Sequence, residues 1–88
     1  MLRQVWKYDV ESGSVSMPLG AEILSVQMQR GVITLWALVD PTAPVVTRSF
    51  VVVGTGHDLP DGNLMYRGTV QAGTFVWHVF ERLTVAAA

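Results

Sequence analysis

Residues 32–58, VITLWALVDPTAPVVTRSFVVVGTGHD, decide the fold of this chain. Two strongly apolar, β-branched segments flank an Asp-Pro turn, and the second segment runs into a glycine-spaced loop. A segment that is apolar on both faces is typical of a central strand, covered above and below. Pro41 and Pro44 stop the hydrogen-bond ladder between the segments, because proline has no backbone N–H. We therefore predict central strands over residues 32–39 and 50–53.

The rest of the chain consists of shorter segments in which apolar and polar residues alternate, separated by turn signals. Such alternation is typical of half-buried antiparallel strands. It occurs in LRQVWKYDV (2–10), SVSM (14–17), AEILSVQMQ (21–29), NLMYRGTVQ (63–71) and TFVWHVFERL (74–83). Residues 1–83 are thus predicted to form one all-β domain, a small antiparallel β-sandwich or barrel of six to seven short strands. Residues 84–88 are predicted to be a frayed tail.

Three of these segments carry more specific predictions. Helix competes with strand in AEILSVQMQ because its residues favour helices, but a period of two, with Leu24, Val26 and Met28 on one face, favours a strand. The first segment mixes charged and apolar residues on one face, which suits a sheet edge, where charges discourage edge-to-edge association. Gly68 is predicted to mark a β-bulge or a site of close packing.

The composition is unusually apolar for so short a chain. Of the 88 residues, 50% are hydrophobic and 15% are charged, whereas about 25% of the residues in average domains are charged. A small domain has more surface per residue and therefore needs more polar cover. The imbalance predicts apolar surface that a partner buries, and so a homo-oligomer. The alternative is a monomer with scattered exposed valines, which is ordinary in soluble proteins.

Charge and cysteine content argue against several classes of protein. The net charge is −1 and the six basic residues are spread along the chain, so the basic patch of a nucleic-acid-binding protein is missing. Without cysteine there is no disulfide and no thiolate metal site. The N-terminus lacks the apolar core of a signal peptide, and no stretch approaches the ~18 apolar residues of a membrane span. We expect an intracellular protein that binds neither nucleic acid nor membrane.

The loop GTGHDLPDG, which follows the second central strand, is the best candidate for a binding site. Gly54 and Gly56 allow backbone conformations or close approaches that a side chain would block. Thr55, His57 and Asp58 add polar groups beside backbone amides, so the loop can cradle a phosphate or carboxylate with His57 as a donor. The loop is not G-x-G-x-x-G and no helix follows it. The alternative is a long hairpin loop that uses glycine and Asx chemistry to turn.

The sequence carries no catalytic signature. No nucleophile elbow places a Ser-His-Asp triad, and Asp58 and Asp61 are more typical of turn formers than of an acid–base pair. His57 and His78 are the two histidines of the chain. A zinc site needs three or four ligands, and a His-Asp pair in a loop with one distant histidine gives it little support. His78 lies in an apolar strand and is expected to be a hydrogen-bonded sheet residue. We predict a protein that is not an enzyme, with no metal and no cofactor.

The three tryptophans are a large share for a chain of this length. Aromatic side chains bury much area and dominate both cores and interfaces. Trp36 and Trp77 are predicted to lie in the core. Trp6, on a strand with exposed charges, is expected in the core or a subunit interface, or else stacked on a base or on a partner side chain.

Six short motifs in combination resemble an uncharacterised family of short proteins from phage genomes and prophages. They are VWKYDV (5–10), MPLGAEILSVQ (17–27), LWALVDPTAP (35–44), RSFVVVGTGHDLP (48–60), YRGTVQ (66–71) and FVWHVFE (75–81). The resemblance assigns no activity to any residue. It implies a setting in which small accessory proteins act by binding, either to a host defence protein or to a nucleotide signal used by host immunity.

We therefore expect a non-enzymatic phage accessory protein of the host cytoplasm, which counters anti-phage defence by sequestering a small nucleotide-like signal in a homo-oligomer. The ligand is expected at a subunit interface, with glycine amides on phosphates and an indole on a base. The predicted ligand-binding residues are Trp6, Gly54, Thr55, Gly56, His57 and Asp58. The alternatives are an inhibitor of a host defence protein, which would use an exposed strand edge or apolar patch, and a small structural or virion accessory domain.

Overall fold

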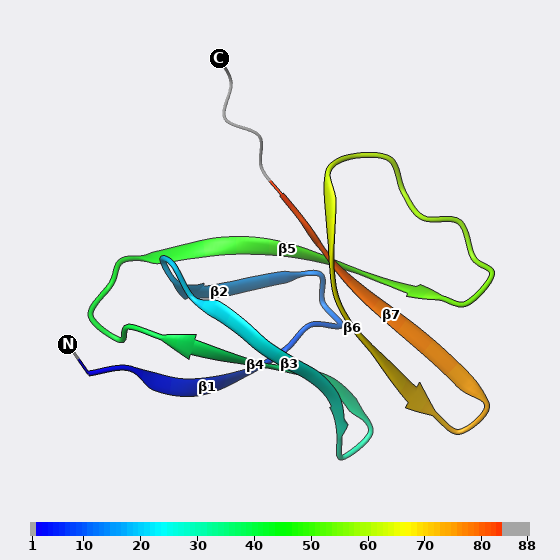
Figure 1. Ribbon diagram of the computed structural model, residues 1–88, viewed down its shortest axis with the longest axis horizontal. Coiled ribbons are helices and arrows are strands. Elements are labelled where there is room, and N and C mark those ends of the chain that lie inside the picture. Colours follow the sequence, from blue (N-terminus) through cyan, green and yellow to red (C-terminus); the bar gives the residue numbers. More distant parts are fainter. Residues whose placement is uncertain (1, 84–88) are drawn as a thin grey trace.

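Alternating side chains and frequent turns produce seven antiparallel strands in this chain (Figure 1). The computed structural model describes residues 2–83, and these contain no helix. The strands are β1 (Gln4–Asp9), β2 (Ser14–Pro18), β3 (Glu22–Gln29), β4 (Val32–Val39), β5 (Val45–Gly54), β6 (Leu64–Ala72) and β7 (Phe75–Arg82). The all-β prediction is confirmed. The predicted tail, residues 84–88, lies outside the described residues.

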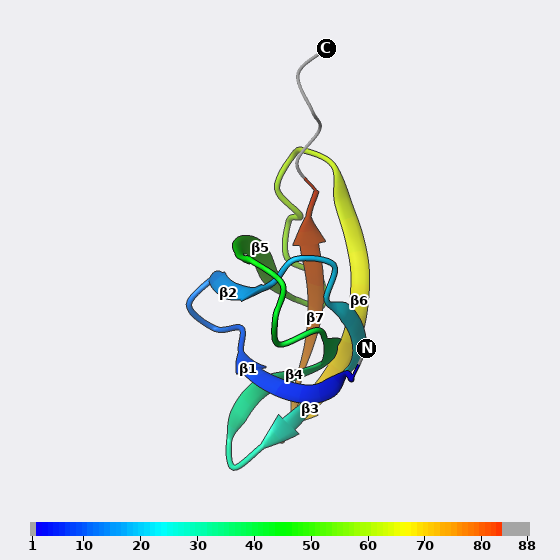
Figure 2. The ribbon, with the colours of Figure 1, turned by 90° about the vertical axis from the view of Figure 1, so that its left-hand side faces the viewer.

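The strands form two sheets, so the architecture is a sandwich. The smaller sheet has the order β1-β4-β3 and the larger sheet the order β2-β5-β7-β6. The Cα atoms extend over 42 × 37 × 17 Å, and the side view in Figure 2 shows this narrow dimension. As their apolar sequences predict, β4 and β5 lie inside their sheets, and β1 lies at an edge.

The core lies between the inner faces, which are the faces that the two sheets turn toward each other. Both sheets contribute, with Leu35 and Val39 from the smaller sheet and Phe50 and Val79 from the larger. Burying an aliphatic or aromatic side chain of this size stabilises a fold by about 1.5–3 kcal/mol. The buried cluster comprises Val10, Val15, Met17, Ala21, Val26, Ile33, Leu35, Ala37, Val39, Phe50, Val70 and Val79.

Two predicted turns form where the sequence places them. Arg30 and Gly31 between β3 and β4 have φ angles of 51° and 79°, and two positive φ angles define the tight hairpin turn that matches strand twist. In the turn before β5, Asp40 accepts hydrogen bonds at Oδ1 from the hydroxyl (2.7 Å) and the backbone N–H (3.0 Å) of Thr42. These bonds lower the pKa of the Asp40 carboxyl.

The predicted alternation of β3 is wrong at Leu24. The register of β3 against β4 shifts between Ile23 and Ser25, which is a β-bulge. Because of the extra residue, Ile23 packs against the core together with Val26 and Met28, while Leu24 is exposed. A bulge changes which face a residue occupies without changing the apolar pattern, so the sequence alone did not reveal it.

The outer face of β4 is less covered than predicted. Trp36, expected in the core, is half-buried and lies opposite Lys7 and Ser25 of the neighbouring strands. A hydrogen bond of 2.7 Å from the Lys7 ammonium to Gln29 joins β1 to β3. The apolar residues on both faces of β4 therefore do not mean a layer above and a layer below, since flanking polar side chains cover part of one face.

One edge of the sandwich is closed by β3 and β6, which belong to different sheets and lie side by side. A Cβ added to Gly68 would lie 2.9 Å from the Cβ of Val26, closer than two Cβ atoms approach in proteins. The two strands can therefore lie this close only because residue 68 has no side chain. The register of β6 against β7 also shifts between Tyr66 and Gly68. Both roles predicted for Gly68, bulge and close packing, are confirmed.

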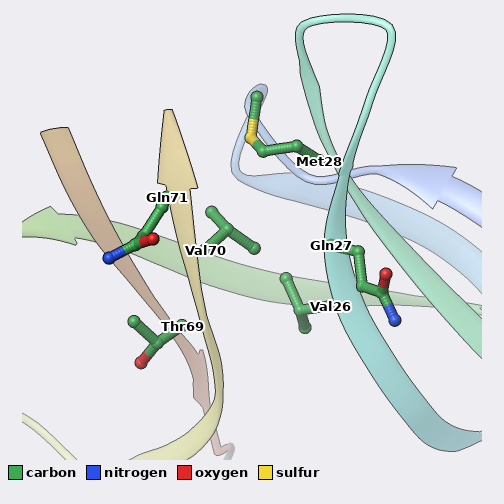
Figure 3. Close-up of a pocket in the computed structure, with 6 residues that line it drawn as sticks. All are labelled: Val26, Gln27, Met28, Thr69, Val70 and Gln71. Carbon is green, nitrogen blue, oxygen red and sulfur yellow. The ribbon is translucent and has the colours of Figure 1, made fainter. Parts of the chain in front are cut away.

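Beyond this contact the two strands leave a shallow hollow of about 390 Å³. Figure 3 shows Val26 and Val70 pointing toward each other across it, and Gln27 and Gln71 pointing away. The six lining residues are Val26, Gln27, Met28, Thr69, Val70 and Gln71, and none of them is charged. The hollow is therefore a shallow, uncharged depression in which two valines meet between polar side chains.

The bulge in β6 also supplies an ionic cluster that the sequence did not reveal. Glu81 of β7 is 4% exposed and accepts hydrogen bonds from Arg48 of β5 at 2.6 and 2.8 Å. Arg67, the residue at the bulge, donates to the same carboxylate at 2.7 and 3.1 Å. Arg48 also donates to the carbonyl of Ala21 at 2.6 Å. The cluster thus joins three strands of the larger sheet to the segment before β3.

Burial and pairing act in opposite directions on Glu81. Burial alone would raise the pKa of its carboxyl, but the hydrogen bonds and charges of Arg48 and Arg67 outweigh burial and leave the pKa below the ordinary value of 4.5. A carboxyl whose pKa is lowered in the folded state stabilises the fold above its unfolded pKa, and that stability is lost as the pH falls through the folded pKa.

Replacing Gly68 with Ala should lower the free energy of unfolding by about 1–3 kcal/mol, because the new methyl group overlaps Val26. Chemical denaturation measures the loss. In the double variant with Val26→Ala, which removes the second close atom, Cγ2 at 3.2 Å, the loss should be smaller than the sum of the two single losses. Unchanged stability of Gly68→Ala would contradict this account of the edge.

Replacing Glu81 with Gln should lower the free energy of unfolding at neutral pH by about 3 kcal/mol, because two guanidinium groups lose their counter-charge. The difference between wild type and variant should shrink as the pH is lowered from about 5 to 3, because the stability that a lowered carboxyl pKa gives to wild type is lost progressively below the ordinary pKa of 4.5. Urea unfolding at several pH values measures it. A difference that stays constant over this range would show that the ion pairs contribute nothing to stability.

Candidate ligand-binding site

The inner face of β7 is covered by the core at one end and open at the other. Val79 is fully buried, Trp77 is half-buried and packs against the core, and Phe75 is 63% exposed. These three residues share one face because side chains alternate along a strand. The core therefore ends between Trp77 and Phe75.

At this end Phe75 and Trp77 form a stacked aromatic pair. Their ring centroids lie 5.9 Å apart and the ring planes differ by 21°. Stacked pairs contribute about 0.5–1.5 kcal/mol beyond the area that they bury, so Trp77 holds the exposed ring of Phe75 in place. A fixed aromatic ring at the surface is a platform on which a planar ligand can stack.

The loop after β5 folds back onto this aromatic pair. A Cβ added to Gly54 would lie 2.8 Å from Nδ1 of His57 and 3.2 Å from the Trp77 ring. The His57 N–H donates to the Gly54 carbonyl at 3.0 Å, and Gly56 has a φ of 85°. Gly54 thus allows a close approach and Gly56 a left-handed backbone, as the sequence predicts.

Loop and aromatic pair together enclose a hollow of about 350 Å³, which we name the aromatic cleft. Its lining residues are Gly54, Thr55, His57, Thr74, Phe75, Val76 and Trp77. Trp77 also lines a second hollow of about 300 Å³, together with Glu11, Ile33 and Val52. The lining of the aromatic cleft thus includes two aromatic residues, a histidine and two threonines, and none of its residues carries a carboxylate.

Two backbone amides of the loop are already engaged. The Thr55 N–H donates to the Val76 carbonyl at 3.2 Å, and the His57 N–H to the Gly54 carbonyl at 3.0 Å. An amide that is paired within the fold is not free to hold a phosphate. The His57 ring is therefore better placed to contact a ligand than these two amides.

The structure does not bring Trp6 to the loop within one chain. Trp6 lies on β1 opposite Ala37, and its indole N–H donates to Gln4 at 2.7 Å. Figures 1 and 2 both place β1 far from the loop between β5 and β6. The loop itself groups Gly54, Thr55 and His57 at the cleft, whereas Asp58 is exposed and not among the lining residues.

A chain of hydrogen bonds fixes Thr55 at the start of the loop. The Thr55 hydroxyl lies 2.7 Å from Nε2 of His78, and Nδ1 of His78 lies 3.0 Å from the Thr69 hydroxyl. The Thr69 hydroxyl in turn hydrogen-bonds the Tyr66 hydroxyl. His78 is therefore a hydrogen-bonded sheet residue, as predicted, and it links the loop to β6 through side chains.

Sequence reasoning missed Phe75 and assigned Trp77 to the core alone. The alternation of TFVWHVFERL places Phe75 and Trp77 on one face, and the turn before Phe75 was the available signal that this face begins at a strand end. Within residues 2–83 no group of three or more His, Asp or Glu side chains is arranged to hold a metal ion. Over the same residues no helix is long and apolar enough to cross a membrane.

Residues 1–87 match a family described as a domain of unknown function, DUF7352. The chain belongs to the DUF7352 family. The match covers all seven strands of this DUF7352 domain, including the loop and strand that form the aromatic cleft. No match was found among curated proteins or among solved structures.

Proposed function

We propose that this DUF7352 protein binds a small molecule that combines a planar ring with an anionic or hydroxyl-bearing group, as nucleotides do. The observation that carries the proposal is the stacked pair of Phe75 and Trp77 beside the aromatic cleft. Stacking of a base on an aromatic side chain contributes about 1–3 kcal/mol. Phe75 takes the stacking role that the sequence suggests for Trp6.

The polar groups of the cleft suit the rest of such a ligand. The His57 imidazole lies on the loop side of the cleft, where it can donate a hydrogen bond to a phosphate or a ribose. The cleft volume of about 350 Å³ is at the lower end of the range for small-molecule sites, about 300–1,000 Å³. We therefore expect a ligand of about the size of a mononucleotide.

The proposal is binding without catalysis, because the sequence carries no catalytic signature. The biological setting that we propose follows from the resemblance to phage and prophage proteins. In that setting the protein sequesters a nucleotide-like signal of host defence in the host cytoplasm.

Thermal unfolding with a panel of nucleotides at millimolar concentration tests this function. A ligand that binds the folded state raises stability by RT ln(1 + [L]/Kd), which is about 2.7 kcal/mol at a concentration of 100 Kd. We expect at least one mononucleotide or cyclic nucleotide to raise the melting temperature. Absence of a shift across the whole panel would refute the proposal.

Matched variants locate the binding. Phe75→Ala should weaken the affinity about tenfold or more, since it removes the stacking surface, and His57→Ala should weaken it by removing a donor. Trp6→Ala is the control, because Trp6 is also an aromatic side chain at the surface, 37% exposed, but lies on β1, far from the loop between β5 and β6. Equal affinities of the Phe75 and Trp6 variants would remove the aromatic cleft as the site.

A further inference from the structure

Strand β1 leaves one edge of the smaller sheet open. Five of its six residues are exposed, and among residues 2–83 its ladder partner is β4. The β1–β4 register runs without a shift from Gln4 to Asp9, and the strand contains neither proline nor glycine. Natural edge strands commonly carry a bulge, a proline or charged side chains, especially Lys, that discourage further pairing. β1 lacks the first two of these devices.

We propose that β1 pairs antiparallel with β1 of a second copy of this chain, with Trp6 opposite Trp6 of the partner subunit. Each three-stranded sheet would then continue into the other as one six-stranded sheet. Homo-oligomers with a twofold axis use the same surface on both subunits. Two copies of one strand meet this requirement when they pair antiparallel and the side chains opposite each other are complementary.

The residues of β1 and the residue before it match in this arrangement. Residues at equal distances from Trp6 lie opposite each other, so Arg3, just before β1, faces Asp9 of the partner subunit, and the pairing occurs twice. Opposite charges and aromatic pairs directly across two strands are favourable. Trp6 is 37% exposed and Leu2 is 90% exposed, so the pairing would also cover apolar surface near the edge.

Neighbouring registers are less favourable. A shift of the partner strand by two residues in one direction places Lys7 opposite Lys7 of the partner subunit. A shift by two in the other direction places Arg3 opposite Lys7 of the partner subunit, and like charges directly opposite destabilise a pair. The charges of Arg3, Lys7 and Asp9 thus discourage association in these registers, as the sequence suggests for an edge, but favour the register centred on Trp6.

The proposal is independent of the proposed ligand. β1 and the loop of the aromatic cleft lie far apart in Figure 1, so the two subunits of such a dimer would each keep an open cleft. The dimer gives Trp6 a position in a subunit interface and agrees with the excess of hydrophobic over charged residues, 50% against 15%.

Analytical ultracentrifugation over a concentration series tests the pairing. We expect the wild-type chain to form a reversible dimer. Arg3→Asp and Asp9→Lys should each weaken the dimer about tenfold or more, because each places two like-charged pairs across the strands. An equimolar mixture of the two variants should dimerise again. In a mixed dimer both cross-strand pairs again join an acidic to a basic side chain, one between the two substituted positions and one between the two unsubstituted positions.

Glu22→Arg is the control, since Glu22 is an exposed residue of β3, at the opposite edge of the same sheet; it should leave the dimer unchanged. Asp9 also accepts the N–H of Glu11 at 2.8 Å, so thermal unfolding must show that Asp9→Lys folds. If it does not fold, Arg3→Asp alone decides. A wild-type monomer at millimolar concentration, a dimer that Arg3→Asp leaves intact, or a mixture of folded variants that stays monomeric would overturn the proposal.

Discussion

The contact between Gly68 of β6 and Val26 of β3 is the constraint on which the rest of the structure depends. It joins two sheets that share no hydrogen-bond ladder, so side-chain packing rather than pairing closes this edge. The same bulge that brings Gly68 to Val26 places Arg67 beside the buried carboxylate of Glu81. Sheet contact and ionic cluster are therefore two consequences of one irregularity in β6.

Closure at one edge leaves other parts of the sandwich open, and these parts are where function is proposed. Packing of β7 against the core ends at Trp77, and Phe75 beyond it is exposed beside the loop. The chain of hydrogen bonds from Thr55 through His78 to Thr69 holds the start of that loop on the sheet. The core stabilises the strands that carry the aromatic pair and the polar loop, and these strands hold the pair and the loop next to each other.

The sequence predicted the individual strands well, but it did not predict which side chains from distant strands come together. Apolar residues on both faces correctly marked β4 and β5 as internal strands, and Gly68 was correctly identified as special, because these properties are local. The bulge at Leu24 leaves no mark in the apolar pattern. The pairing of Glu81 with Arg48 joins residues 33 positions apart in the chain, and no local rule predicts it. Phe75 was missed because its exposure depends on where the other sheet ends.

The central claim is that a ligand stacks where the core of this sandwich ends. The most direct measurement is a titration with adenosine monophosphate followed by nuclear magnetic resonance, in which the three tryptophans give separate indole N–H signals. The account predicts saturable shifts of the Trp77 indole and of the Thr55 and Val76 amides, with the Trp6 indole unmoved. Absence of shifts at millimolar ligand, or the largest shifts on Trp6, would contradict it.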